Sequence, residues 1–225
     1  MLRRELLGES VTPDGAPITL TREGVALVVR VDNVPLMSSR VHGSEEALAE
    51  VGCRTLRARK GARVLVGGLG MGFTLRAVLD ALDDDAEVVV AELLPTIVDW
   101  NRGPLGPLAN MPLDDPRAAL FVGDVAAAVK AAPASFDAIL LDVDNGPEAF
   151  TVASNAWLYG RAGVGALYRA LRPRGCVVVW SAVESAPFTK TLRAAGFTTE
   201  VLPVRARGAV RKGSRHWLFV ARRAA

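Results

Sequence analysis

Four acidic residues stand where predicted strands of this chain end, and their positions favour a site for a cationic ligand. Glu92 ends the apolar run "EVVVAE", Asp124 follows "LFVG", and Asp142 and Asp144 close "FDAILLDVD". Ligands of open α/β sheets bind beyond the carboxyl ends of the strands. While the chain stays extended, Asp142 and Asp144 point to the same face, because successive side chains of a strand alternate. Two adjacent carboxylates attract cations, and one of them could take the proton of an attacking amine, which typically contributes roughly 100- to 10,000-fold to the rate.

A glycine-rich turn precedes these acids, in "RVLVGGLGMGF" at residues 63–73. The turn lacks the Lys-Ser/Thr pair of a triphosphate-binding loop, and Phe73 stands where a dinucleotide fingerprint would have its last glycine. What remains is Gly68, Gly70 and Gly72, a spacing that lets a nucleoside approach the backbone closely.

Glu92 and Asp124 complete a predicted nucleoside site with this turn. Glu92 follows it by about 20 residues, where an acid accepts hydrogen bonds from both ribose hydroxyls. Asp124, with Val125 beside it, is placed to accept from an adenine amino group. We therefore predict that S-adenosylmethionine or a related compound binds here. Alternatively, Glu92 and Asp124 only cap the helices that follow them, and residues 142–147 form a solvated turn.

Three aromatic side chains are candidates for the wall of an acceptor pocket. Trp157 and Tyr159 follow the acidic loop, and His42 lies where the N-terminal segment meets the rest of the chain. Aromatic residues at helical spacing can equally belong to the core. His216, at the start of the last predicted strand, is interpreted as structural.

The composition indicates a globular protein with one sizeable core. Half of the 225 residues are apolar, and no apolar run reaches the roughly 20 residues of a membrane helix. The N-terminal segment has no apolar stretch of signal-peptide length, and two cysteines are too few for a disulfide framework, so we expect a cytoplasmic protein without membrane contact. Two histidines and two distant cysteines without ligand spacing predict no metal site.

The net charge of +3 is concentrated near the C-terminus, where seven Arg or Lys and no acid follow Glu200. Such a basic segment could bind nucleic acid. We favour the simpler interpretation that Arg is the usual surface cation of this chain.

The order of apolar runs and helical segments predicts an α/β fold. Residues 17–37 contain short β-like runs, and five strands then alternate with helices from residue 62. The last two strands, "FTTEVLPVRAR" and "HWLFVARR", are too close for a crossover helix and must pair antiparallel. We therefore predict a doubly wound, mostly parallel, seven-stranded sheet of the class I methyltransferase-like, Rossmann-like type with a small N-terminal β-hairpin appendage.

The expected helices span residues 72–82, 124–132, 155–171 and 186–195, with another from Pro95. The expected domains are a β-hairpin region at 1–43, a connecting helix at 44–61 and an S-adenosylmethionine-binding catalytic domain at 62–225.

The chain resembles the spermidine synthase-like family over about residues 24–222. The segments that carry the resemblance occur in the family's order: "VLVGGLGMGFTLR", "AELLPTIVDW", "VGDV", "FDAILLDVDNGP", "LYGRAGV" and "LRPRGCVVVWSA". The resemblance implies that Glu92 holds the ribose, that Asp124 holds the adenine, and that Asp142 is the catalytic acid that opens the family's Asp-Ser-Ser-Asp-Pro motif.

Several positions depart from the family's pattern. Met71 replaces the Asp that binds the ammonium tail of the donor, and Asn145, which we assign to the acceptor site, replaces the second motif Asp. Ser44 and Glu45 replace a Tyr-His pair that helps to hold the polyamine. Val66 stands where ordinary methyltransferases have an acid that grips the methionine ammonium.

These departures leave three function classes open. A helix start carries about half a positive charge, so a turn with Met71 in place of Asp should prefer a donor that keeps its carboxylate. We therefore expect methyl transfer from intact S-adenosylmethionine to an amine or another small nucleophile. The alternatives are aminopropyl transfer from decarboxylated S-adenosylmethionine to a polyamine, and a nucleic-acid-directed or non-catalytic S-adenosylmethionine-binding module. A homodimer is compatible with each of them.

Overall fold

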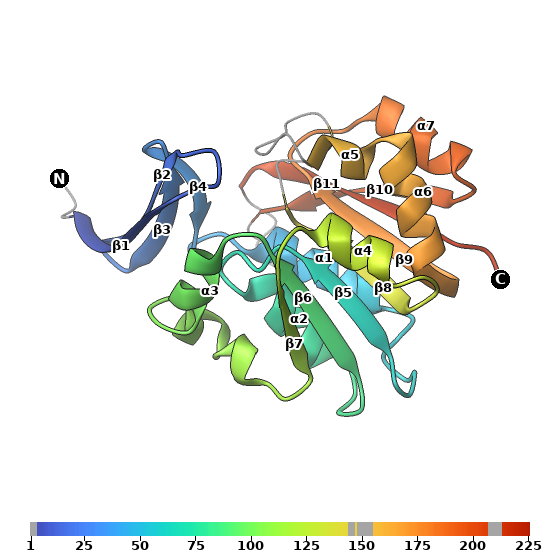
Figure 1. The fold of residues 1–225 in the computed structure, drawn as a ribbon, viewed down its shortest axis with the longest axis horizontal. Coiled ribbons are helices and arrows are strands. Elements are labelled where there is room, and N and C mark those ends of the chain that lie inside the picture. The colour runs from blue at the N-terminus through green and yellow to red at the C-terminus, as the bar shows by residue number, and fades with distance from the viewer. Residues whose placement is uncertain (1–3, 144–146, 148–154, 207–212) are drawn as a thin grey trace.

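Two β-sheets organise the chain, a four-stranded N-terminal sheet and a seven-stranded central sheet (Figure 1). The computed structural model describes residues 4–143, 147, 155–206 and 213–225. The N-terminal sheet comprises β1 (Arg4–Val11), β2 (Pro17–Glu23), β3 (Ala26–Val31) and β4 (Val34–Ser38). The strands of the central sheet are β5 (Arg63–Gly67), β6 (Glu87–Glu92), β7 (Ala118–Val122), β8 (Phe136–Leu141), β9 (Leu171–Ser181), β10 (Thr198–Arg205) and β11 (Arg215–Arg222).

The N-terminal sheet is an antiparallel meander in which each strand pairs with the next. Asp32 and Asn33 join β3 to β4 with φ of 49° and 64°, the left-handed conformation that a two-residue hairpin requires. Ile18 and Val29 are fully buried in the same hydrophobic core as Trp100 of the helix α3 (Pro95–Asn101). The meander is therefore packed against α3 at one side of the molecule, as Figure 1 shows.

The central sheet has the strand order β10-β11-β9-β8-β5-β6-β7. The five strands from β9 to β7 are parallel, and β11 pairs antiparallel with both β9 and β10. This arrangement confirms the predicted α/β fold, including the antiparallel hairpin at its end. It places the carboxyl ends of β5, β6 and β8 at one edge.

Helices cover both faces of the central sheet (Figure 1). Alternate residues of each strand face opposite sides, so Val64 and Val66 belong to one apolar cluster and Leu65 to the other. The first cluster receives α1 (Gly43–Cys53), α2 (Phe73–Ala81) and α3, and the second receives α4 (Val125–Ala131), α5 (Asn155–Tyr159), α6 (Arg161–Ala170) and α7 (Ala186–Ala194). None of the helices in the described part of the chain combines the length and apolar character that a membrane span requires.

Several predicted elements differ in extent from those in the structure. The helix expected at 44–61 ends at Cys53, and turns occupy most of the remainder. The helix expected at 155–171 is divided into α5 and α6, because Gly160 is extended, with ψ of 171°, and caps α6. Strand β1 and two short 3-10 helices, Gly106–Ala109 and Pro112–Asp114, were not predicted.

Candidate functional site

A cavity of about 760 Å³, the central cleft, lies at the carboxyl ends of β5, β6 and β8. Gly68, Gly70, Glu92, Asp124 and Asp142 all line it. Val125 lies in its wall, and Met37 and Leu36 of β4 border it from the N-terminal sheet. The structure thus brings together most of the residues predicted to hold a nucleoside.

The glycine turn brings β5 and β8 into close contact. Gly68 has φ of 89°, a left-handed conformation, and a Cβ atom added there would overlap the carbonyl oxygen of Asp142. Gly72 also has a left-handed φ, of 87°, and precedes α2. A Cβ atom at Gly72 would meet Pro112 Cγ at 2.9 Å and Asn101 Oδ1 at 3.0 Å. Gly72 therefore shapes the packing below the turn and, contrary to the predicted site, does not line the cleft.

Glu92 is a buried carboxylate that holds two loops of the cleft. Its Oε2 accepts a hydrogen bond from the Leu69 amide at 2.9 Å, and its Oε1 accepts one from the Leu94 amide at 2.8 Å. Burial raises the pKa of Glu92, and these amide donors oppose the rise. A carboxylate oxygen has room for more than one donor, so both oxygens can still accept from a ligand hydroxyl.

Asp124 has the capping geometry that we considered as the alternative to adenine binding. It is the N-cap of α4, and its Oδ1 accepts a hydrogen bond from the Ala126 amide at 2.8 Å. The residue also lines the central cleft, so capping and ligand binding are compatible there.

Asp142 is a partly buried acid at the end of β8. Its Oδ2 accepts a hydrogen bond from Thr74 Oγ1 at 3.1 Å. Burial, together with the negative charge of Glu45, raises the pKa of Asp142 to about 7, although the Thr74 hydrogen bond opposes the rise. A carboxylate with this pKa can accept a proton near neutral pH. The predicted partners Asp144 and Asn145 lie outside the described residues.

A hydrogen-bonded group of cleft residues, Ser44, Glu45 and His216, was not among the predicted site residues. Ser44 Oγ donates to Glu45 Oε2 at 2.6 Å, and His216 Nδ1 lies 3.1 Å from Ser44 Oγ. All three line the central cleft, so His216 is part of its wall, which corrects our purely structural interpretation. In the sequence, only the family resemblance pointed to Ser44 and Glu45, because they replace the pair that helps to hold the polyamine.

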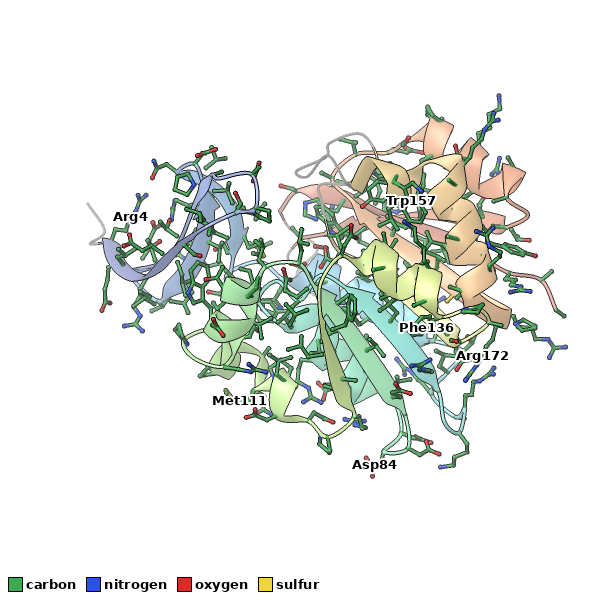
Figure 2. All side chains as sticks on the ribbon, in the orientation of Figure 1. Arg4, Asp84, Met111, Phe136, Trp157 and Arg172 are labelled. Atoms are coloured by element: carbon green, nitrogen blue, oxygen red, sulfur yellow. The ribbon has the colours of Figure 1, made fainter. Side chains whose placement is uncertain are left out.

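Trp157 and Tyr159, predicted to wall the acceptor pocket, lie elsewhere. Figure 2 places Trp157 among the helices on the face covered by α4 to α7, where Lys130 Nζ lies 3.9 Å from its ring centroid. Tyr159 is buried and packs edge-on against Phe188, with ring centroids 5.6 Å apart. Tyr159 belongs to the second apolar cluster and Trp157 packs against it, so both residues are part of the core rather than of the cleft.

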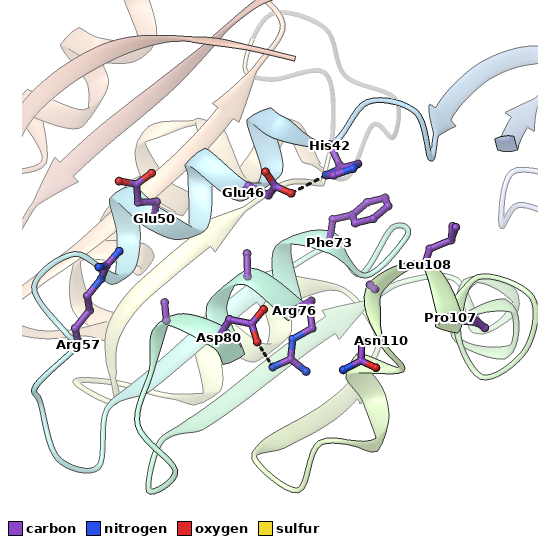
Figure 3. Close-up of a pocket in the computed structure, with 13 residues that line it drawn as sticks. His42, Glu46, Glu50, Arg57, Phe73, Arg76, Asp80, Pro107, Leu108 and Asn110 are labelled. Atoms are coloured by element: carbon purple, nitrogen blue, oxygen red, sulfur yellow. Dashed lines mark hydrogen bonds and ion pairs between the residues drawn. The ribbon is translucent and has the colours of Figure 1, made fainter. Parts of the chain in front are cut away.

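His42, also predicted to contact the acceptor, faces a second cavity of about 720 Å³ that α1 and α2 help to line. Figure 3 shows its ring over that of Phe73, with centroids 4.2 Å apart, and its hydrogen bond to Glu46, in which His42 Nδ1 and Oε1 are separated by 2.8 Å. Phe73 lines both cavities. His42 is therefore separated from the central cleft by this ring.

Comparisons with known proteins bear on the family and the fold of this chain. A family model described as the spermine/spermidine synthase domain matches residues 41–192. A crystal structure of a spermidine synthase in complex with the transition-state analogue AdoDATO is 19% identical, with a TM-score of 0.74, over 98% of this chain and 73% of that one. The spermidine synthase from Thermotoga maritima is 20% identical, with a TM-score of 0.75 and the same coverage. No curated protein matches the chain.

Proposed function

Because this chain belongs to the spermine/spermidine synthase family, we propose that it transfers an aminopropyl group from decarboxylated S-adenosylmethionine to an amine. The observation that carries this proposal is the central cleft, where the glycine turn, Glu92 and Asp142 meet at one edge of the sheet. Family membership favours this alternative over the methyl transfer that we expected from Met71.

The cleft fits an adenosyl compound in size and in its donor and acceptor groups. Its volume of about 760 Å³ lies within the roughly 300 to 1,000 Å³ of small-molecule sites. In this proposal Gly68 and Gly70 let the nucleoside approach the backbone, Glu92 accepts from the ribose hydroxyls, and Asp124 accepts from the adenine amine.

Asp142 acts on the acceptor in this proposal. The donor supplies a carbon bound to positively charged sulfur, and attack by the amine nitrogen forms the C–N bond while the C–S pair leaves on sulfur as a neutral thioether. Asp142 orients the nitrogen and takes the proton that the amine must lose. Holding both reactants in line provides a further large part of the acceleration.

Methyl transfer is a second candidate because of Met71. This residue lines the cleft and is only 5% exposed, so the turn presents a thioether where the family has a carboxylate. Without that carboxylate, the positive start of α2 is free to attract the carboxylate of intact S-adenosylmethionine.

One incubation separates the two candidates. The protein is mixed with each donor and a panel of linear diamines and polyamines, and the products are weighed by mass spectrometry. We expect an aminopropyl adduct with the decarboxylated donor only. A methyl adduct from intact S-adenosylmethionine would replace the proposal with the second candidate, and no transfer from either donor would refute both.

A further inference from the structure

The start of α1 and the start of β11 are joined by a partly buried series of hydrogen bonds that none of the roles above uses. Ser44 is 1% exposed and has a single hydroxyl hydrogen, which it donates to Glu45 Oε2 at 2.6 Å. Ser44 must therefore accept from His216 Nδ1 at 3.1 Å. This hydrogen bond fixes the tautomer of His216, with its proton on Nδ1.

Neighbouring residues restrict the movement of Ser44 and His216. The ring of Trp180 packs edge-on against His216, with centroids 4.6 Å apart. The amide of Gly43 donates to the carbonyl of Ala206, just after β10, at 2.9 Å. Burial lowers the pKa of His216, which favours the neutral imidazole. A neutral His216 orients the Ser44 hydroxyl without neutralising Glu45.

The charge of the central cleft indicates which class of ligand can bind beside Glu45. Among the described residues, its lining contains five carboxylates and no Arg or Lys: Asp14, Glu45, Glu92, Asp124 and Asp142. No ion pair to a basic side chain is formed by Glu45 or Asp142 in the described part of the chain. Burial raises the pKa of Glu45, and a charge interaction with His42 opposes the rise, but no Arg or Lys pairs with Glu45 or Asp142 in the described residues. An ammonium group can supply the missing countercharge.

We propose that Glu45 binds the acceptor's ammonium group opposite Asp142, and that His216 is a positioning residue that orients Glu45 through Ser44. This inference rests on the proposed function and deepens it, since it names the residues of this chain that bind and position the ammonium group of the acceptor. Asp142 takes one proton from that nitrogen, and Glu45 keeps a hydrogen bond to it. Glu45 thus supplies a second acid at the position where the family has a neutral or basic pair.

The first test measures diamine binding by calorimetry, with the protein saturated by 5′-methylthioadenosine so that no turnover is needed. Glu45→Gln should weaken the affinity for a linear diamine by about tenfold to a hundredfold, because it removes a charged hydrogen-bond acceptor. Its affinity for the nucleoside should stay unchanged. Glu46→Gln is the matched control, since Glu46 follows on the same helix and faces the second cavity. Equal diamine affinity of Glu45→Gln and the wild type would overturn the proposal.

The second test asks whether His216 acts through Ser44. Ser44→Ala and His216→Ala should each raise KM for the diamine with little change in nucleoside affinity. His216→Asn, which can again place an N–H near Ser44, should restore most of the lost affinity. A loss in His216→Ala that His216→Asn does not restore would contradict the positioning role.

These readouts separate the inference from the proposed function. If diamine binding depends on Glu45 but neither donor is used, the proposed function fails and the amine site stands. If transfer occurs and Glu45→Gln binds the diamine normally, the proposed function stands and the amine site fails.

Discussion

Gly68 lies directly against the backbone of Asp142, and a Cβ atom at Gly68 would overlap the carbonyl oxygen of Asp142. The neighbouring Gly67 carbonyl accepts a hydrogen bond from the Asp142 amide at 2.9 Å. The turn proposed to hold the donor and the acid proposed to act on the acceptor are therefore fixed to each other by backbone contacts. A change at one is transmitted to the other.

Gly68→Ala should damage both stability and ligand binding. The backbone oxygen cannot move aside as a flexible side chain would, so β5 and β8 must separate. Gly15→Ala is the matched control, because Gly15 has φ of 87° and nothing within 4 Å of an added Cβ. We expect Gly15→Ala to lower the free energy of unfolding by about 1–2 kcal/mol through its left-handed backbone alone, and Gly68→Ala to lower it by more. Urea unfolding and calorimetry with 5′-methylthioadenosine measure the two effects, and equal losses in both variants would contradict the close-contact argument.

Asp142→Asn should lower kcat by at least about 100-fold while nucleoside affinity is retained. The amide keeps the shape of the side chain but cannot take a proton. Asp83→Asn, at an exposed ion pair with Lys60, is the control for the same chemical change. Turnover that survives in Asp142→Asn would exclude Asp142 as the proton acceptor.

The pH dependence of kcat/KM should carry the titration of Asp142, whose pKa is raised to about 7. Activity should rise with pH through this value, because only the ionised carboxylate accepts a proton. Glu45→Gln removes the charge that helps to raise this pKa, so the rise of kcat/KM with pH should move to lower pH. In Glu46→Gln this rise should occur at the same pH as in the wild type. If Glu45→Gln also leaves it unchanged, Glu45 does not influence the pKa of Asp142.

The same titration should appear in the stability of the protein. The folded-state pKa of Asp142, about 7, lies above its ordinary value of 3.8. Between these two pH values the folded state holds a proton that the unfolded state has lost. The contribution of Asp142 to the free energy of unfolding therefore falls as the pH rises over this range, and it is lost above about 7. The free energy of unfolding measured from pH 4 to pH 8 should decline less in Asp142→Asn than in the wild type. Equal slopes would show that Asp142 does not carry the effect.

The central sheet and the strand-end residues that line the cleft were predictable because both follow from local patterns. The strands of a covered parallel sheet are continuous apolar runs, and the residues after them share one edge, which is how Glu92 and Asp142 were identified. Strand β1 has mostly exposed or partly buried residues and no regular apolar alternation, so no pattern marks it. The Ser44–His216 contact joins residues 172 positions apart. It depends on how β11 enters the sheet beside α1, which no local pattern encodes.

Glu92→Gln should weaken nucleoside binding by about tenfold to a hundredfold, the effect expected when a hydrogen bond to a charged group is lost. Glu87→Gln is the control at the other end of β6, where Glu87 pairs with Arg63 at an exposed site. Calorimetry with 5′-methylthioadenosine makes the comparison. If Glu92→Gln binds the nucleoside as tightly as Glu87→Gln does, Glu92 only organises its loops and the ribose role is wrong.

Met71 should determine which donor the cleft prefers, and Met71→Asp tests this directly. The side chain is 5% exposed and lines the cleft beside the start of α2, so a carboxylate there would meet the tail of the donor. An added negative charge attracts the cationic tail of decarboxylated S-adenosylmethionine and repels the carboxylate of the intact compound. The ratio of the two dissociation constants should therefore move toward the decarboxylated donor by at least about tenfold, which corresponds to about 1.4 kcal/mol. Met71→Asn has a similar shape without the charge and should leave the ratio near that of the wild type. If both variants change the ratio equally, shape rather than charge at residue 71 selects the donor, and the electrostatic argument for methyl transfer as the second candidate falls with it.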